Sequence, residues 1–318
     1  MRRLGMCLLA GLCWGLATYS SAAELELRIG YLRGPSELAL VKADGSLERE
    51  LAAQGVKLKW LGPFSAAAPA YEALNAGALD VTLGASTAFI TAIAGGIPMS
   101  MFAYKRMSPG SEGIVVRAAA PIHELADLRG RKVAVNRGGT GEYLLSRALE
   151  TAGMPPDSVD KEYLTPTDST SAFANGHVDG WATWDPFLAL AQNNYDGRLL
   201  VNGAQLGSEN ASGYFVRQSF LRDHPQLVRT LFESLRKAND WARGHPLEAG
   251  RIRGREINAS ESVAEQLGRN DTGEVLKPLG SEEVHHLANI ADWYVRQGIV
   301  RECPDVSAHV VDVTTLGR

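Results

Sequence analysis

Short apolar runs alternate with segments of helical periodicity along the first two thirds of the chain, and this alternation constrains the fold most strongly. Such runs are typical of buried strands, and strands separated by helices are typical of α/β proteins with largely parallel sheets. The predicted strands are Leu27–Leu32, Leu58–Leu61, Val81–Leu83, Ser100–Tyr104, Gly113–Arg117, Lys132–Asn136, Gly180–Trp184, Arg198–Val201 and Tyr214–Arg217. The predicted helices between them are Ser36–Ala53, Ala66–Ala76, Ser86–Ala94, Gly141–Ala152, Ser169–Asn175 and Pro186–Asn194.

The last third of the chain, after Arg217, is predicted to be mostly helical. One buried helix face is indicated by apolar residues at helical spacing, namely Leu227, Val228, Leu231, Phe232, Leu235, Ala238 and Trp241. His224-Pro225 begins this helix and Gly244 ends it. A final long helix is predicted over Glu282–Gln297.

Two pairs of similar segments lie about a hundred residues apart. Ile29–Gly34 resembles Val133–Gly138, and Ala73–Asp80 resembles Ala172–Asp179. In the second pair a glycine suits the left-handed residue that follows a helix, and an aspartate leads into the next strand. The echo indicates two lobes built from similar βαβ units, although each match is short.

An extended segment should cross between the lobes twice. Ser111–Arg117 and Gly213–Arg217 are the natural pair of crossings. We therefore predict lobe I over residues 24–115 plus 217–318 and lobe II over residues 116–216. Two crossings form a two-segment hinge, and a ligand can close such lobes by binding both of them.

The N-terminus has the layout of a secretory signal peptide. Arg2 and Arg3 form a charged start, Leu4–Leu16 is apolar, and Ser21-Ala22-Ala23 supplies the small residues that signal peptidase reads. We predict a signal peptide over residues 1–23, cleaved after Ala23, and export of the mature chain. The apolar stretch is shorter than the roughly 20 residues that span a bilayer. The alternative is a buried N-terminal helix, although the segment contains no Asp or Glu.

Composition limits the classes of function. Without the signal peptide Cys303 is the only cysteine, so no internal disulfide can form and the core must hold the fold. About 295 residues suffice for two domains. Loss of Arg2 and Arg3 takes the net charge from −4 to −6, and a mildly acidic chain without a basic run is not expected to bind nucleic acid. No other stretch is apolar enough to cross a membrane, so we expect a soluble protein.

Ligands of open α/β sheets bind beyond the carboxyl ends of strands, beside helix N-termini that favour negative charge. The first such turn contains Arg33, which could bring positive charge to the cleft or be solvated, and Ser36, which could contact a ligand or only cap the helix. Tyr31 at the strand end is a candidate aromatic contact. A second turn contains Ser86 and Thr87 in a stretch without charge, which favours an anion that carries no ammonium group.

The third turn contains Gly138, Gly139 and Thr140, and its three glycines would let backbone amides approach an anion closely. It lacks the Lys-Ser/Thr ending of a P-loop and the spacing of a dinucleotide-binding turn. A plain connection between a loop and a helix is the alternative. The sequence therefore predicts an anion-binding turn of no nucleotide-binding type.

Further candidates follow later strands. Asp168 lies at another helix start, and Asp185 before Pro186 suits the cap of the next helix. Trp181 and Trp184 should point to opposite faces of their strand, and we favour Trp184 as the cleft wall. Tyr214 is a further cleft aromatic. A purely structural role remains the alternative for each of these residues.

No catalytic constellation emerges from the sequence. The seven histidines show no metal-binding spacing. Cys303 precedes Pro304 near the end of the chain, which is a poor place for a nucleophile, and no Gly-x-Ser-x-Gly elbow occurs. We expect no catalytic residue, no metal and no cofactor.

The chain resembles the periplasmic aliphatic-sulfonate-binding proteins of ABC importers, within a larger group for nitrate, sulfonate, taurine and thiamine precursors. The segments that carry the resemblance are Arg28–Tyr31, Glu72–Gly77, Leu128–Asn136 with Gly138, Tyr143–Leu145, Ala172–Gly176 with Val178-Asp179, and Trp184-Asp185-Pro186-Phe187. They occur in the order of the family, to about residue 245. The C-terminal quarter matches more loosely.

The resemblance implies an α/β, type-II periplasmic-binding-protein fold, a ligand between the lobes, no chemistry, and docking onto an ABC permease at the inner membrane. It implies a periplasmic protein of sulfur metabolism, which we expect to be a monomer. The cleft positions that carry over are Tyr31, Ser86, Gly138, Thr140, Asp168, Trp184 and Asp185. Sulfonate and taurine binders often carry an acidic residue where this chain has Gly84–Thr87, and this departure puts taurine in doubt.

Other readings stay open at this point. The ligand could be a sulfate ester, nitrate, an aromatic carboxylate or a thiamine precursor. The protein could also be a ligand-sensing partner of a membrane receptor. An enzyme is the alternative from another class, because thiamine-pyrimidine synthases share this fold. A resemblance to those enzymes would imply a metal-assisted chemistry that uses clustered cysteines, and the mature chain lacks such a cluster.

Overall fold

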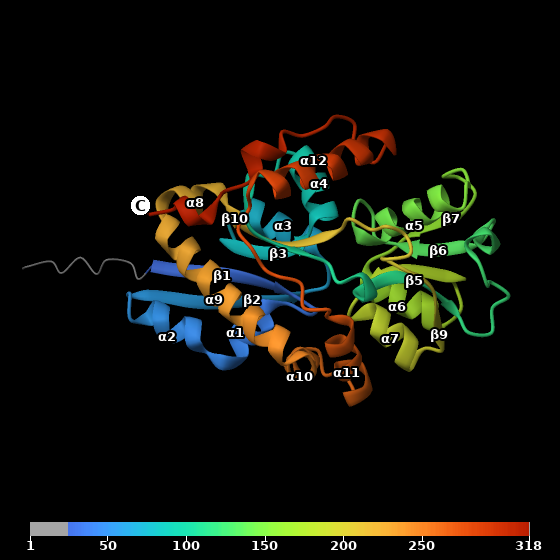
Figure 1. The fold of residues 1–318 in the computed structure, drawn as a ribbon, viewed down its shortest axis with the longest axis horizontal. Coiled ribbons are helices and arrows are strands. Elements are labelled where there is room, and N and C mark those ends of the chain that lie inside the picture. The colour runs from blue at the N-terminus through green and yellow to red at the C-terminus, as the bar shows by residue number, and fades with distance from the viewer. Residues whose placement is uncertain (1–24, 318) are drawn as a thin grey trace, which may run out of the picture.

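The computed structural model describes residues 25–317, which form two α/β lobes, each built on a five-stranded sheet (Figure 1). The predicted signal peptide lies outside these residues. The sheet of lobe I contains β1 (Leu25–Leu32), β2 (Val56–Phe64), β3 (Val81–Ala85), β4 (Met99–Arg106) and β10 (Ala211–Arg217). The sheet of lobe II contains β5 (Glu112–Arg117), β6 (Lys132–Val135), β7 (Asp160–Tyr163), β8 (Gly180–Trp184) and β9 (Gly197–Asn202).

Helices follow most of the strands. In lobe I these are α1 (Glu37–Asp44), α2 (Ser46–Ala52), α3 (Ala67–Asn75) and α4 (Ser86–Ala94), and in lobe II they are α5 (Thr140–Thr151), α6 (Pro166–Ala174) and α7 (Phe187–Asn194). The C-terminal part contains α8 (Gln218–Asp223), α9 (Pro225–Gly244), α10 (Pro246–Glu256), α11 (Glu261–Asn270) and α12 (Ser281–Arg296). Short 3₁₀ turns lie at Pro109–Ser111, Leu125–Leu128, Val306–His309 and Val313–Thr315. Within residues 25–317, no helix has both the length and the apolar character needed to cross a bilayer.

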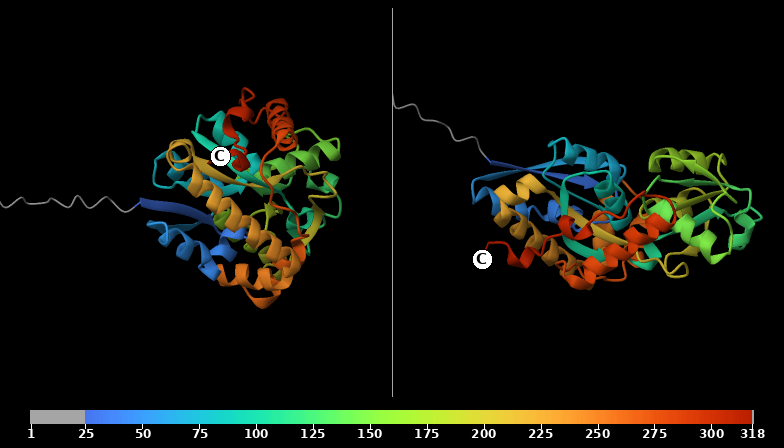
Figure 2. Two further views of the ribbon diagram at one scale, coloured as in Figure 1. Left: turned by 60° about the vertical axis from the view of Figure 1, so that its left-hand side comes forward. Right: turned by 90° about the horizontal axis from the view of Figure 1, so that it is seen from above.

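The two sheets have the same topology. Their strand orders are β2-β1-β3-β10-β4 and β7-β6-β8-β5-β9. In each sheet the first three strands are parallel, and the fourth is antiparallel to both of its neighbours. The right-hand view of Figure 2 shows the same division, with the green segments gathered in one lobe. The α/β fold class and the two lobes predicted from the sequence are confirmed.

The chain crosses between the sheets at residues 107–111 and 203–210, which join β4 to β5 and β9 to β10. The segments predicted as crossings are instead strands within the sheets. Residues 211–216, assigned to lobe II from the sequence, belong to β10, whose backbone pairs with β3 and β4 of lobe I. Residues 112–115, assigned to lobe I, pair in lobe II. We therefore propose that lobe II is better bounded by residues 112–202.

Local differences from the sequence prediction have simple causes. The single helix predicted over Ser36–Ala53 is two helices, because Gly45 takes a left-handed conformation with φ 64° and ends the first. Strand β7 was not predicted, because its sequence Asp-Lys-Glu-Tyr at a sheet edge contains no apolar run. Helix α9 begins at Pro225 and ends at Gly244, as predicted.

The repeated segments of the sequence are equivalent parts of the two lobes. Gly77 and Gly176 follow α3 and α6 with φ values of 74° and 71°. Three residues later, the carboxylate of Asp80 accepts a hydrogen bond from the backbone N–H of Arg28 at 3.0 Å. In lobe II, the carboxylate of Asp179 accepts from Lys132 N–H at 2.9 Å. Each aspartate thus ties the residue before one strand to the backbone of the strand beside it.

The two aspartates differ in burial and charge. Asp80 is 1% exposed and also accepts hydrogen bonds from the guanidinium groups of Arg28, at 2.8 and 2.9 Å, and Arg217, at 2.6 Å. Burial raises the pKa of Asp80, but these hydrogen bonds lower it by more. The Asp179 side chain is 37% exposed, and its nearest cation is Arg131 at 3.9 Å. Asp80 therefore joins β1, β3 and β10 through buried charge, whereas Asp179 makes a local contact.

We predict that Asp80→Asn lowers the free energy of unfolding by about 3 kcal/mol, because it removes one partner of a buried ion-pair cluster. Asp179→Asn at the equivalent position should cost no more than about 1 kcal/mol. The contribution of Asp80 is present above its unfolded pKa near 4 and is lost as the pH falls below it. Urea unfolding of both variants between pH 3 and 7 checks this, and equal losses would contradict it.

Candidate functional site

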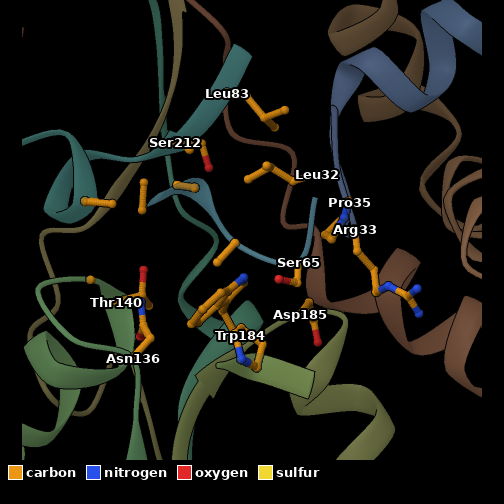
Figure 3. A pocket seen from close by; sticks show the side chains of 18 of the residues that line it. Leu32, Arg33, Pro35, Ser65, Leu83, Asn136, Thr140, Trp184, Asp185 and Ser212 are labelled. Atoms are coloured by element: carbon orange, nitrogen blue, oxygen red, sulfur yellow. The ribbon is translucent and has the colours of Figure 1, made fainter. Parts of the chain in front are cut away.

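A cavity of about 420 Å³ lies between the lobes, where the carboxyl ends of both sets of parallel strands meet. Its wall includes the turns after β1, β2 and β3 of lobe I and after β6, β7 and β8 of lobe II. The crossing at residues 107–111 and parts of α10 and α11 complete the wall. Because all six parallel strands end here, the helices that follow them begin at this cavity (Figure 3).

Three of these helices begin at an alanine or glycine, which has no side-chain group that could cap the helix, although in α5 the N–H of Gly141 donates to the side-chain oxygen of Asn136 at 2.7 Å. The N-cap residues of α3, α4 and α5 are Ala66, Ala85 and Gly139, and each lines the cavity. By contrast Ser36 caps α1 and Thr165 caps α6 through their hydroxyl groups. An uncapped helix start leaves backbone N–H donors and the positive end of the helix dipole available to an anion. Both lobes contribute such starts to the cavity.

Aromatic and aliphatic side chains make up much of the wall. Trp184 is partly buried, and its indole meets the ring of Phe187 edge to face at 5.9 Å between centroids. Figure 3 shows the indole amid the lining residues, between Thr140 and Asp185. Leu32 and Leu83 line lobe I. The cavity thus joins an amide-rich region to an apolar one.

Charged groups of both signs line the cavity. Arg33 and Arg137 are exposed, and the guanidinium of Arg137 lies over the ring of Tyr163 at 3.6 Å. Lys105 is buried and donates to Glu37 at 2.6 Å. Burial raises the pKa of Glu37, but the charges of Lys105 and Arg253 and its hydrogen bonds outweigh burial and hold that pKa at about 2. Glu37 is therefore ionised beside the two buried cations.

Asp185 is the most strongly perturbed carboxyl group of the wall. It is 3% exposed, and it accepts hydrogen bonds from Ala189 N–H at 3.1 Å and from the Asn270 amide at 2.8 Å. Burial raises the pKa of Asp185 to about 7, and the two hydrogen bonds offset only part of that effect. Asn270 belongs to α11 and Asp185 to lobe II, so this bond links the two.

The structure brings together five of the twelve residues that the sequence predicted as ligand contacts. The residues that line the cavity are Arg33, Gly139, Thr140, Trp184 and Asp185. The residues outside its wall are Tyr31, Ser36, Ser86, Thr87, Gly138, Asp168 and Tyr214. Ligand contact by any of them stays a prediction, and the positions of the second group have physical reasons.

Two of the three predicted aromatic contacts, Tyr31 and Tyr214, pack within lobe I. Tyr31 meets Trp60 edge to face at 6.4 Å, and Lys42 Nζ lies 4.7 Å from the Tyr31 ring centroid. Tyr214 is 1% exposed, and its hydroxyl donates to the buried carboxylate of Glu37. Both rings are therefore parts of the core of lobe I rather than of the cavity wall.

Three polar candidates have local roles. Ser36 caps α1. Asp168 is exposed and accepts from the hydroxyl of Thr165 at 2.7 Å. Gly138 is buried, and its N–H donates to Glu142 at 2.7 Å while its carbonyl accepts from Thr91 at 2.6 Å. Each of these groups is satisfied within the protein.

Ser86 and Thr87 belong to a buried hydrogen-bond network at the crossing. The side-chain amide of Asn210 donates to Thr140 of lobe II at 3.0 Å and to Glu112 at 3.0 Å. Ser86 of lobe I donates to the carbonyl of the same amide at 3.1 Å, and the hydroxyls of Thr87 and Thr140 lie 3.5 Å apart. Asn210 thus holds the N-termini of α4 and α5 together behind the cavity.

Sequence reasoning missed several lining residues. The turn Ser65–Pro69 follows β2, so the same carboxyl-end rule could have found it. Lys105, Arg253 and Asp271 come to the wall only through tertiary packing, and no local pattern indicates them. Among residues 25–317, no group of three or more His, Cys, Asp or Glu side chains could hold a metal ion.

Comparisons with known proteins agree with this geometry. A model of the NMT1/THI5-like family matches residues 51–249. An Escherichia coli (strain K12) protein named as an aliphatic sulfonates-binding protein is 28% identical, over 99% of this chain and 98% of its own length. The alkanesulfonate-binding protein of Xanthomonas axonopodis pv. citri, solved bound to MOPS, superposes with a TM-score of 0.83 at 25% identity, over 90% of this chain and 98% of the other.

The fold also occurs in an enzyme. A solved desulfurization enzyme superposes with a TM-score of 0.68 over 90% of this chain and 96% of its own, at 17% identity. A likeness at this identity concerns the fold alone. Binding and catalysis therefore have to be distinguished by the residues of the cavity.

We predict that Asp185→Asn changes the pH dependence of stability. The stability contributed by protonated Asp185 is complete below its unfolded pKa near 4 and is lost as the pH rises to about 7. The wild type should therefore lose about 2–3 kcal/mol of unfolding free energy between pH 5 and 8 that the variant keeps. Denaturant unfolding across this range measures the difference, with Asp168→Asn at an exposed site as the control. Parallel profiles for wild type and Asp185→Asn would contradict the prediction.

Proposed function

We propose that this chain, which belongs to the NMT1/THI5-like family, is a solute-binding protein that captures a small organic anion, an aliphatic sulfonate, between its lobes. The observation that carries the proposal is the convergence of three helix N-termini, from both lobes, whose N-cap residues have no capping side chain, on one cavity with an apolar wall. The names of the two sulfonate-binding relatives support the same ligand class.

The two parts of the ligand match two parts of the cavity. A sulfonate stays ionised at physiological pH and accepts hydrogen bonds through three oxygens, so backbone N–H groups at helix starts suit it. Its alkyl tail would pack against Trp184, Leu32 and Leu83. Burial of both parts by groups from two lobes would favour the closed arrangement of the hinge.

We infer reversible binding rather than catalysis. Among residues 25–317, those that line the cavity include no cysteine and no histidine, the side chains most often used as nucleophile and general base. The buried carboxyl of Asp185 lies in the wall, but its hydrogen bonds go to an amide and a backbone N–H rather than to a nucleophile. Reversible binding needs no catalytic side chain, so the residues that line the cavity are sufficient for it.

The remaining parts of the proposal concern the cell. A signal peptide over residues 1–23 would direct the mature chain to the periplasm, and a monomer would then deliver its ligand to an ABC permease. An alternative is that a membrane receptor binds the protein with its ligand and thereby senses the ligand.

Calorimetry with a series of ligands tests the substrate class. Linear alkanesulfonates should bind, and each further methylene that enters the apolar part should add about 0.8 kcal/mol until that part is full. Sulfate esters, taurine, nitrate and an aromatic carboxylate serve as competitors. Failure of every sulfur oxyanion to bind a folded protein would exclude the proposed ligand class.

We predict that Trp184→Ala weakens alkanesulfonate binding about ten- to a hundredfold, because the tail loses an aromatic contact. The melting temperature of the empty protein should change by only a few degrees, since Trp184 is partly exposed at the wall. Trp181→Ala is the matched control: Trp181 is 2% exposed in the core, and its loss should cost about 3–5 kcal/mol of stability. A large fall in stability for Trp184→Ala would make that side chain part of the core.

A further inference from the structure

The buried cation Arg253 has hydrogen-bonding capacity that the protein does not use. It lies on α10, is 1% exposed and lines the cavity. Its Nη1 donates to the carboxylate of Asp271 at 2.6 Å. Its Nε and Nη2 have no hydrogen-bond partner among the described residues. A guanidinium this deeply buried normally pairs all of its donors, because an unpaired buried charge is costly.

The nearest other carboxylate does not supply the missing partner. Glu37 Oε1 lies 3.8 Å from Nη2 of Arg253, which is too far for a hydrogen bond. That oxygen already accepts from Lys105 at 2.6 Å and from Asn239 at 3.2 Å, and Oε2 accepts from Tyr214. Glu37 thus already accepts three hydrogen bonds, and two nitrogens of Arg253 stay without an acceptor among the described residues.

The free pair of donors has the geometry of an oxyanion contact. Nε–H and one Nη–H of a guanidinium lie in one plane and point the same way, so together they match two oxygens of a carboxylate, sulfonate or phosphate. Because Nη1 is bound to Asp271, the plane of the group is fixed before any ligand arrives. The hydrogen bond to Asp271 thus fixes the orientation of the unpaired Nε and Nη2 groups.

Close packing of α10 on α11 holds Arg253 at the wall. Gly250 and Gly254 flank it on α10, and a Cβ at Gly250 would lie 2.4 Å from the carbonyl oxygen of Ala264 on α11. Leu267 of α11 packs with Ala189 of lobe II, and α10 contacts α1 of lobe I. The two helices therefore touch both lobes and leave the backbone of Arg253 little freedom.

We propose that Arg253 is the charged anchor of the ligand, and that its Nε and Nη2, both buried in this structure, become accessible when the lobes move and bind two oxygens of the anionic head group. The proposal rests on the proposed function and adds to it the residue that selects for a planar pair of oxygens. Arg253 and Asp271 lie beyond residues 51–249, the part that matches the family. The exposed Arg33 and Arg137 are solvated and contribute less, since water screens their charge.

Three variants test the assignment by calorimetry with 1-pentanesulfonate. Arg253→Gln should weaken binding at least a hundredfold, and Arg253→Lys about tenfold, because lysine keeps the charge and loses the fork. Asp271→Asn leaves Arg253 charged, keeps an amide oxygen that can accept from Nη1 and removes a negative charge from the wall, so it should bind as tightly as wild type or more tightly. Arg251→Gln on the same helix, where Arg251 is exposed and pairs with Glu261 and Glu265, is the matched control and should not change affinity.

The outcomes distinguish a failure of the proposed function from a failure of the assignment of Arg253. If the wild type binds no sulfonate, sulfate ester or carboxylate, the proposed function fails and the anchor fails with it. If the wild type binds and folded Arg253→Gln binds equally well, only the assignment of Arg253 is overturned. Should Arg253→Gln not fold, Arg253→Lys and Asp271→Asn decide: equal weakening in both would mean a structural role, whereas weakening in Arg253→Lys alone supports the anchor.

Discussion

Two sheets, each with three parallel strands whose carboxyl ends face the other lobe, impose the main constraint on this molecule. Each parallel strand needs a connecting helix, and each helix begins at the carboxyl end of the strand before it. Because both sheets turn that end toward a shared cavity, helix N-termini from both lobes meet there. The proposed binding of an anion in this cavity therefore rests on the topology before any side chain is considered.

The side chains around the cavity form two groups with different roles. Hydroxyl and amide groups behind the cavity, centred on Asn210, join the starts of α4 and α5. A buried set of charges on the lobe I side, in which Glu37 is shared by Lys105, Tyr214 and Asn239, neutralises itself almost completely. Arg253 is the exception in that set. Buried charge networks of this kind cost desolvation energy, so a partly paired member indicates a use beyond stability.

The sequence was sufficient for the architecture and for part of the site. Alternating apolar runs and helices predicted the α/β class, and the repeated segments predicted two similar lobes. The carboxyl-end rule led to Thr140 and Trp184, which line the cavity. It could not choose between neighbours on one strand: Leu32 points to the cavity and Tyr31 to Trp60, because successive side chains alternate between faces. Arg253 and Asp271 meet only because α10 packs against α11, and no local pattern encodes that contact.

The fourth strand of each sheet has a consequence for how the chain assembles. Sheet β7-β6-β8-β5-β9 is made entirely from residues 112–202, whereas sheet β2-β1-β3-β10-β4 needs β10 between β3 and β4. A polypeptide that emerges from its N-terminus therefore exposes β3 and β4 without their shared neighbour until more than two hundred residues have appeared. The contiguous half can complete its hydrogen-bonded ladder first, and the earlier-synthesised half waits for the returning strand. The half of the chain that is synthesised first is therefore the half that completes its sheet last.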